Sequence, residues 1–483
     1  MYTKSWQRLL IVITAVILSF LLLAHLSVQA SGPTRAYRAG QVIVHLEAAA
    51  DISQINTTYG TTTIRSLANG RATYLLEIPA SSDPIGLIQT LQADPQIESA
   101  ELNFIGYTPE AILGDMQAWG IDVTALPSDL YSWPSDLYSW PSDLYSWPSD
   151  LYSWMESEQV TTTLSTMRAV YKWEPTGADG AHYFQQPTVQ RLNLDQAHNY
   201  SQGSGVIVAV LDTGIDYTHP LFISHLVPGY DFVDNDPTPE DAIDGQDHDG
   251  DGLVNEVAGH GTHIAGIVRL VAPQAQIMPL RVLDPDGQGD SFEVARAILY
   301  AIENGATVIN MSLGAMIPSA ILLDMVEEAA ASGVVVVAAA GNLNNTKPIY
   351  PAASPCALGV TSVNTGWVKS SYASYGSWVD LAAPGERIFS AFPGGNFGWW
   401  RGTSMSVPFV AGQVALLQSL NPALTLAQTS QLVAGTAHPL DAQNPAYNGW
   451  LGAGEVDIGA SVSQLAVGQW PAVAPDLFAG CGS

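Results

Sequence analysis

Short apolar runs alternate with helical patterns along the chain from about residue 181. The apolar runs are VIVAVLD (206–212), IMPLRVL (277–283), TVINMSL (307–313) and VVVVAAA (334–340), and helical patterns occupy 291–304 and 319–332. Strands that are apolar throughout and alternate with helices are typical of a parallel sheet with helices on both faces. We therefore predict an α/β domain over residues 181–465, followed by a tail at 466–483.

The helix predicted at 291–304 carries signals at both of its ends. Asp290 and Glu293 are spaced as a capping box, and Gly305 follows the last helical residue. In parallel sheets, functional groups gather where strands end. Asp212 and Asn342 each follow such an apolar run.

Residues 36–107 have a different order of patterns. A strand (YRAGQVIVHL) precedes a short helix that ends at Gly60, and two further strands flank the turn Asn69-Gly70. An amphipathic helix (PIGLIQTLQADP) and a last strand (IESAELNFI) follow. The predicted order is βαββαβ, which indicates a small α+β domain over residues 31–107.

The first 30 residues resemble a targeting segment. Lys4 and Arg8 precede the apolar run LLIVITAVILSFLLLA, and small residues surround Ala30. This pattern predicts a secretory signal peptide cleaved after Ala30, and hence a secreted protein. An uncleaved membrane anchor is the alternative, although the run is short for a membrane span.

Residues 108–180 are predicted to be a linker, and they contain the heptamer PSDLYSW in four unchanged copies. A proline in each copy excludes a continuous helix or coiled coil. An aromatic-rich adhesive segment is the alternative to a linker.

Composition excludes some functions. The chain has 483 residues, 47% of them apolar, and a formal net charge of −29. That charge opposes binding to nucleic acid and to anionic membrane surfaces, so we expect neither as a partner. We expect a monomer. Cys356 and Cys481 could form one bridge or stay free, and the sequence does not decide between them.

Two histidines three residues apart, His260 and His263, raise the question of metal binding or catalysis. A zinc helix of the HExxH type needs histidines four apart with a glutamate between them, so a metal is disfavoured. Nucleophilic catalysis needs a base, an orienting acid and an activated hydroxyl group. Asp212 is a candidate acid, and Ser404, which follows Gly402-Thr403 at the start of an amphipathic helix, is a candidate nucleophile.

Five motifs stand in a fixed order: DTGID (212–216), GHGTHIAG (259–266), VINMSLG (308–314), VVAAAGN (336–342) and GTSMSVPFVAG (402–412). Together they resemble the subtilisin-like (subtilase) serine proteases over nearly all of residues 181–465. The resemblance implies a serine endopeptidase that forms an acyl-enzyme.

The resemblance also implies a role for each matching residue. Ser404 would attack the peptide carbonyl, His260 would be the base, and Asp212 would orient His260. Asn342 would donate to the oxyanion, together with the amide of Ser404. His263 and His219 match positions without a catalytic duty. The expected substrate-binding residues are Ser312, Leu313, Gly314, Gly287, Gly289, Ala340 and Gly341. Since none of them is charged, we expect a large apolar or neutral residue before the cut.

The acidic stretch at 231–256 contains ten carboxylates and no lysine or arginine. Asp247, Asp249 and Asp251 match the first half of an EF-hand loop, but its last position is Ala258. Structural calcium is therefore a hypothesis, and a solvated acidic loop is the alternative. No catalytic cofactor is expected.

Residues 31–107 resemble the family's inhibitory propeptide. The protein is then expected to be a zymogen that cuts itself near Tyr107. A permanent N-terminal binding domain is one alternative, and a non-catalytic binding protein on a protease fold is another. A processing protease with a single target is a third.

Overall fold

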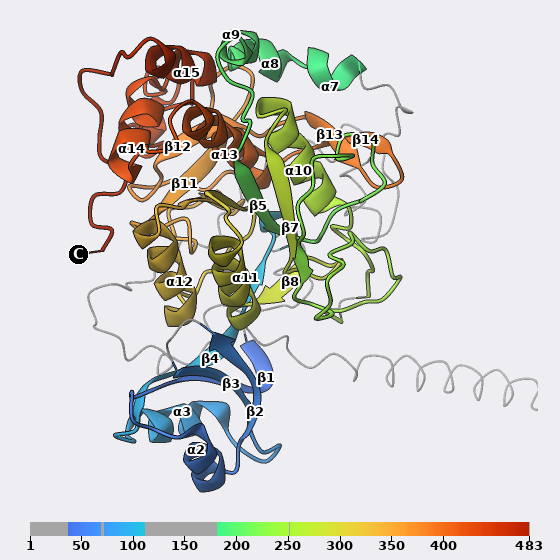
Figure 1. The fold of residues 1–483 in the computed structure, drawn as a ribbon, viewed down its shortest axis with the longest axis vertical. Coiled ribbons are helices and arrows are strands. Elements are labelled where there is room, and N and C mark those ends of the chain that lie inside the picture. The colour runs from blue at the N-terminus through green and yellow to red at the C-terminus, as the bar shows by residue number, and fades with distance from the viewer. Residues whose placement is uncertain (1–36, 69–71, 112–180, 251, 483) are drawn as a thin grey trace, which may run out of the picture.

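The computed structural model describes residues 37–68, 72–111, 181–250 and 252–482. The predicted signal peptide, the Asn69-Gly70 turn, the PSDLYSW repeats and Asp251 lie outside these residues. The described chain forms a small N-terminal unit and a larger α/β body, which meet at strand β4 (Figure 1).

The N-terminal unit has the predicted βαββαβ order. Its elements are β1 (Tyr37–Leu46), α2 (Ile52–Tyr59), β2 (Thr62–Ala68), β3 (Ala72–Glu77), α3 (Pro84–Gln92) and β4 (Ile97–Tyr107). The strands pair antiparallel in the order β2-β3-β1-β4. Side chains of both helices, such as Ile55 and Leu91, pack on Val42 and Val44 of β1.

The α/β body is built on the predicted parallel sheet. Its seven strands, in spatial order, are β12 (Leu381–Pro384), β11 (Ala357–Val363), β10 (Val335–Ala339), β9 (Val308–Met311), β5 (Ile207–Asp212), β7 (Gln276–Arg281) and β6 (Tyr230–Asp231). Every pair in this sheet is parallel. The fold class predicted from the sequence is therefore confirmed.

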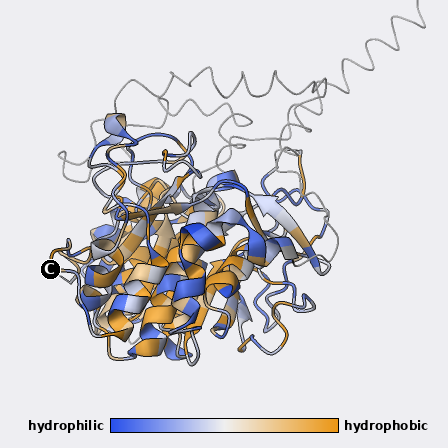
Figure 2. Ribbon diagram, turned by 90° about the horizontal axis from the view of Figure 1, so that it is seen from above, coloured by the Kyte–Doolittle hydropathy of each residue, from blue (hydrophilic) through white to orange (hydrophobic). Residues whose placement is uncertain are grey.

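Helices cover both faces of this sheet. On one face lie α10 (His260–Val271) and α13 (Thr403–Leu420), and on the other lie α11 (Ser291–Glu303) and α12 (Ala320–Ala331). Successive residues of β5 point to opposite faces: Val208 and Val210 join the first core, Ala209 and Leu211 the second. Hydrophobic residues accordingly concentrate inside the body, with polar residues on its outer loops (Figure 2).

Shorter elements complete the body. They are α7 (Ala181–Gln185), α8 (Pro187–Arg191), α9 (Leu194–His198), β8 (Gln288–Asp290), the hairpin β13 (Ile388–Phe392) and β14 (Asn396–Trp400), α14 (Leu426–Gly435), the 3-10 helix η3 (Pro445–Tyr447) and α15 (Ile458–Ala466). A disulfide joins Cys356 to Cys481 and so ties the tail to the body. Among the described residues, no helix has the length and apolar character needed to cross a membrane.

The capping box predicted for α11 forms only in part. The Asp290 carboxylate accepts from the Glu293 amide at 3.1 Å, as expected. The Glu293 carboxylate does not return the bond, because it pairs with Arg296 of the same helix and with Arg65 of the N-terminal unit. A contact between the two units therefore replaces half of the local cap.

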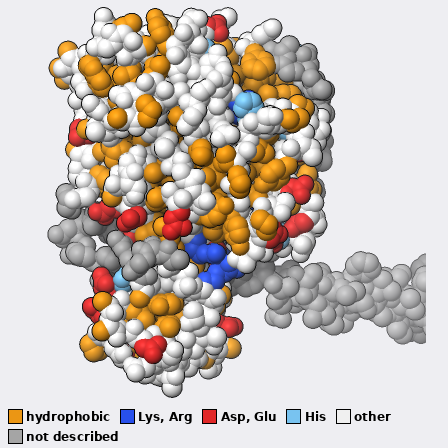
Figure 3. Space-filling view, in the orientation of Figure 1, with side chains coloured by type: hydrophobic (Ala, Val, Ile, Leu, Met, Phe, Trp, Pro, Cys, Tyr) orange, Lys and Arg blue, Asp and Glu red, His pale blue; other side chains and the backbone are white. Residues whose placement is uncertain are grey.

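The N-terminal unit docks on the body through apolar and polar side chains. Ile43, Leu67 and Leu75 of its sheet join the core cluster that contains α11 and α12. Polar groups lie at the starts of these two helices. Glu101 of β4 accepts from the amides of Ala320 and Ile321 at 2.9 and 3.0 Å. Asn103 accepts from the Phe292 amide at 3.2 Å. Arg38 also lies 3.7 Å from Asp290, and Figure 3 shows basic side chains gathered where the two units meet. Side chains of one unit thus satisfy helix-start amides of the other.

Candidate active site

The candidate acid and base come from neighbouring elements. Asp212 is the last residue of β5, and His260 is the first residue of α10. The Asp212 Oδ1 lies 2.7 Å from the His260 Nδ1, and both side chains are fully buried. A carboxylate on Nδ1 fixes the orientation of the imidazole and leaves Nε2 for proton exchange.

A second buried carboxylate, Asp241, holds the start of α10. It accepts from the Gly259 amide at 2.8 Å and from the Thr262 amide and hydroxyl at 3.0 and 2.6 Å. It also accepts from the Thr213 hydroxyl at 3.0 Å, next to Asp212. Burial raises the pKa of Asp241, although its bonds from Thr262 and Gly259 oppose that shift.

Asp241 was not predictable as a functional residue. It belongs to the acidic stretch, 18 residues before the Gly259 amide that it binds, and no motif or periodicity separates it from its neighbours. Only the closed loop reveals that one carboxylate links the residues beside the acid and the base.

Ser404 lies in the first turn of α13, as predicted. Pro408 lies inside this helix, and its missing N–H leaves the Ser404 carbonyl without a helical donor. The Ser312 hydroxyl donates to that carbonyl at 2.9 Å. Ser312 thus replaces the helical hydrogen bond that the proline removes.

The amide of Asn342 is oriented by its neighbours. Its Oδ1 accepts from the Thr403 amide and hydroxyl, both at 3.0 Å. The Thr403 hydroxyl in turn accepts from the Gly341 amide at 3.1 Å. With Oδ1 occupied in this way, Nδ2 is the atom that Asn342 presents next to Ser404.

Glu110, from the chain just after β4, connects these groups. The Ser404 hydroxyl donates to its Oε2 at 2.7 Å, and the same oxygen lies 3.3 Å from the His260 Nε2. The Asn342 Nδ2 donates to Oε1 at 3.2 Å. The structure therefore brings Asp212, His260, Ser404 and Asn342 to one point, with Glu110 among them. Sequence analysis did not single out Glu110.

Electrostatics at this point favour a charged imidazole. Burial by itself lowers the pKa of His260, but Asp212 and Glu110 raise it to about 10. His263, one turn along α10, is different: burial and the charge of His260 lower its pKa to about 3. Its Nε2 lies 3.2 Å from the Ile388 carbonyl oxygen. His219 likewise meets a backbone oxygen, that of Asn396, at 2.7 Å.

The chain leading to Glu110 lies between two segments that were predicted to bind substrate. Tyr107 and Gly314 exchange amide–carbonyl hydrogen bonds of 3.0 and 2.9 Å. Ile105–Tyr107 pair antiparallel with β8, where Tyr107 stands opposite Gln288 and Gly106 opposite Gly289. The Thr108 amide then donates to the Gly287 carbonyl at 3.0 Å. Residues 105–108 therefore lie as an extended peptide that pairs through its backbone with β8 on one side and with Gly314 on the other.

Glycines make room for this peptide. A Cβ on Gly287 would lie 2.9 Å from the Thr108 hydroxyl oxygen, and one on Gly402 would lie 1.7 Å from the Glu110 Oε1. Of the remaining predicted residues, Leu313 is buried in the core, and the Ala340 amide donates to Val360 at 2.9 Å. Thus Gly314, Gly287 and Gly289 contact the peptide, whereas Leu313 and Ala340 lie in the framework.

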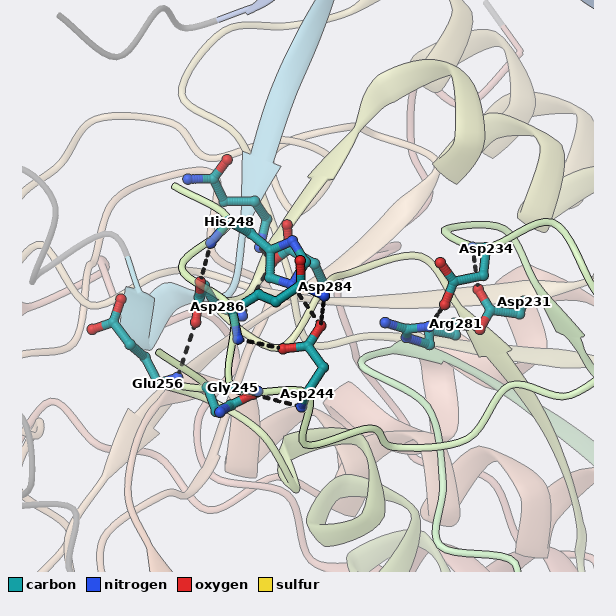
Figure 4. A network of polar contacts seen from close by, with 12 residues as sticks. Asp231, Asp234, Asp244, Gly245, His248, Glu256, Arg281, Asp284 and Asp286 are labelled. Atoms are coloured by element: carbon teal, nitrogen blue, oxygen red, sulfur yellow. Dashed lines mark hydrogen bonds and ion pairs between the residues drawn. The ribbon is translucent and has the colours of Figure 1, made fainter. Parts of the chain in front are cut away.

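The acidic loop converges on a residue that was not predicted. Oxygens of Asp247, Asp249 and Asp286 lie within 4.8 Å of one another, and Asp286 is fully buried. The Asp286 carboxylate accepts from the His248 amide at 2.7 Å, next to Asp284 and Asp244 (Figure 4). Burial raises the pKa of Asp286, although the hydrogen bond from the His248 amide opposes that shift. Asp251, the third predicted ligand, lies outside the described residues.

Comparison with known proteins identifies two regions. The subtilase family profile matches residues 203–454, and that of the fervidolysin N-terminal prodomain matches residues 24–103. Thermitase of Thermoactinomyces vulgaris is 42% identical over 240 residues, which cover 48% of this chain and 81% of thermitase. Subtilisin BL of Lederbergia lenta is 37% identical over 268 residues, which cover 53% of this chain and 92% of that protein.

Two solved structures resemble the fold. A protease from Pseudoalteromonas arctica has a TM-score of 0.51 at 30% identity, with 61% of this chain and 98% of that chain covered. Fervidolysin from Fervidobacterium pennivorans, a keratinolytic enzyme related to subtilisin, has a TM-score of 0.63 at 21% identity. That match covers 88% of this chain and 61% of fervidolysin, so both units described here have a counterpart in the fervidolysin fold.

Proposed function

Since the chain belongs to the subtilase family and is a serine endopeptidase with an N-terminal prodomain, we propose that it hydrolyses peptide bonds through an acyl-enzyme on Ser404. The observation that carries this proposal is the convergence of Ser404 and His260 on one oxygen, 2.7 and 3.3 Å away, with Asp212 on the far side of the imidazole. Three elements distant in sequence thus supply a nucleophile, a base and an orienting acid.

Each group has one role in the reaction. His260 takes the proton of the Ser404 hydroxyl as its oxygen bonds to the peptide carbonyl carbon, and then gives that proton to the leaving amine. Asp212 stabilises the imidazolium that forms between these steps. Water then attacks the acyl ester by the same route, which releases the carboxylic acid and restores Ser404. Asn342 Nδ2 and the Ser404 amide donate to the oxyanion, where one donor contributes about 3–4 kcal/mol.

Specificity follows from the walls of the groove. Gly287, Gly289 and Gly314 offer backbone pairing, and neither Ser312 nor Gly341 carries a charge. A large apolar or neutral residue before the cut is therefore preferred. A peptide library should show this preference, and a profile dominated by Arg or Lys would contradict it.

The protein is made as a secreted zymogen. The predicted signal after Lys4 and Arg8 supports export, and the peptide from Ile105 to Glu110 in the groove supports inhibition by the prodomain. Self-cutting near Tyr107 then separates the prodomain from the body. Because residues 105–107 pair with β8 and Gly314 of the same chain, the first cut needs no second molecule.

A structural calcium ion fits the acidic loop. Oxygens of Asp247, Asp249 and Asp286 lie within 4.8 Å of one another, and carboxylate oxygens are the ligands that calcium prefers. Asp286 immediately precedes Gly287, so an ion held there would steady the groove edge. It would take no part in the reaction.

Paired serine variants test this proposal. Ser404→Ala should lower kcat about 10⁶-fold, because removal of the nucleophile leaves only binding and oxyanion stabilisation. Ser406→Ala is the matched control, since Ser406 lies on the same helix and donates to the Ala383 carbonyl at 3.1 Å. Peptidase activity of purified, folded proteins is the measurement. Near-normal turnover by Ser404→Ala would reject the assignment.

A further inference from the structure

The Glu110 side chain lies buried inside the candidate catalytic centre. It is 1% exposed, and its two oxygens contact the Ser404 hydroxyl, the Asn342 amide and the His260 imidazole. These are the nucleophile, the oxyanion donor and the base of the proposed reaction. One side chain therefore engages the nucleophile, the base and one of the two oxyanion donors.

The backbone around Glu110 does not lie like a substrate. Up to Tyr107 the chain is extended, and both the N–H and the carbonyl of Tyr107 form hydrogen bonds with Gly314. In an antiparallel ladder the next hydrogen-bonded pair would join residue 109 to Ser312. Residue 109 is a proline without an N–H, so it cannot donate to the Ser312 carbonyl.

The chain turns helical at this proline. The Ala111 amide donates to the Thr108 carbonyl at 3.1 Å and lies 3.2 Å from the Thr108 hydroxyl oxygen, so Thr108 caps a turn over residues 109–111. Ala111 is 5% exposed and packs in the body's core. This turn directs the Glu110 side chain toward Ser404.

Gly402 and the imidazole make the carboxylate fit. The Glu110 Oε1 takes the space where a Cβ of residue 402 would lie. The other acid on the same imidazole is Asp212, so His260 lies between two buried carboxylates. A carboxylate buried in this way is stable only with such partners.

We propose that Glu110 is an autoinhibitory residue that keeps the uncut chain latent by engaging Ser404, Asn342 and His260 with its side chain. The proposal rests on the proposed function of Ser404 and adds the group that restrains it. Pro109 and Thr108 are positioning residues in this device. Before the chain can be cut near Tyr107, the Glu110 carboxylate must leave the centre.

A serine-directed fluorophosphonate probe measures this restraint on the full chain. Uncut and cut forms are resolved on a gel, and the initial labelling rate of each band is recorded. Wild-type uncut chain should label about 10- to 100-fold more slowly than the cut form, the factor expected from a hydrogen bond to a charged group. Glu110→Ala should raise the uncut rate to near that of the cut form, with faster self-cutting.

Two further variants keep the test decisive. Glu110→Gln preserves side-chain size and should also label faster than wild type. It therefore still tests the proposal if Glu110→Ala does not fold. Glu98→Ala, an exposed glutamate of β4 that pairs with His45, should label as slowly as wild type. Uncut Glu110→Ala and Glu110→Gln that label no faster than wild type would overturn the proposal.

Failure of the proposed function looks different. If the cut wild-type form is not labelled on Ser404, Ser404 is not the nucleophile. If it is labelled and the Glu110 variants stay slow, only the autoinhibitory role is wrong.

Discussion

The N-terminal unit has one core cluster of nine buried residues, whereas two larger clusters fill the α/β body on either face of its sheet. The contacts between the two units are both apolar and polar. Ile43, Leu67 and Leu75 join the core cluster of α11 and α12, while Glu101 accepts from amides of α12 and Asn103 from an amide of α11. A small domain buries too little apolar surface to be very stable alone. We therefore expect the body to stay folded by itself and the N-terminal unit to be the part that can be released.

The largest effect on the body should come from Asp241. Asp241→Asn replaces an acceptor of four hydrogen bonds with a group that faces some of those donors with its own N–H, which costs about 3 kcal/mol. Because Gly259 precedes the base, kcat should also fall about 100-fold. Thermal unfolding and kinetics of the cut enzyme measure both. Glu240→Gln, an exposed neighbour, is the control.

Equal melting temperatures and equal kcat values of the Asp241→Asn and Glu240→Gln enzymes would show that the start of α10 does not depend on the buried Asp241 carboxylate. The comparison between a rigid body and a releasable unit would then lose its main support within the active site.

Removal of calcium should affect the body next. An ion bound only to the folded state adds about 2.7 kcal/mol when free calcium is a hundredfold above its dissociation constant. Excess chelator should therefore lower the melting temperature of the cut enzyme. Asp286→Asn should melt at the chelated temperature with or without calcium. An unchanged melting temperature in chelator, with no calcium in the purified protein, would leave only an acidic loop.

Glu101 should affect how strongly the N-terminal unit binds to the body, and not the stability of the body itself. Glu101→Ala leaves the amides of Ala320 and Ile321 without their acceptor, which should weaken docking by about 1–3 kcal/mol. Uncut Ser404→Ala chain carrying this change should be cleaved sooner by an added protease in its N-terminal unit. Glu98→Ala in the same background should not. Equal protection of both variants would mean that helix capping does not hold the unit.

A further effect concerns pH. Asp212 and Glu110 raise the pKa of His260 in the uncut chain to about 10, above the usual value of about 6.5. The stabilisation that this charge provides is complete below about pH 6.5 and is lost as pH rises through about 10. Melting temperatures of uncut Ser404→Ala chain should therefore fall over this range. Added Glu110→Gln should flatten the slope, and an identical slope would argue against the contact.

The sequence predicted regular elements and motif residues well, for physical reasons. Apolar runs such as VIVAVLD had to be strands of a two-sided sheet, and Val208 and Ala209 indeed face opposite cores. Asp212, His260, Ser404 and Asn342 stand in motifs, so their meeting was expected.

Residues that act only through chain closure were not predictable. Asp241, Glu110 and Asp286 are ordinary acids in the sequence, and each is buried where distant segments meet. Glu110 lies 294 residues from the serine that it contacts. The half-formed capping box at Asp290 has the same origin, because Glu293 pairs with Arg65 from the other unit.

The proposal to test first is that Ser404 is the nucleophile of the body and that Glu110 restrains it until the Glu110 carboxylate leaves the centre. Mass mapping of the fluorophosphonate adduct on the cut wild-type enzyme tests it most directly. We expect one adduct, on the peptide that contains Ser404, and full loss of peptidase activity as this adduct forms. Peptidase activity that survives without an adduct on Ser404, or an adduct on another residue that abolishes it, would contradict the account.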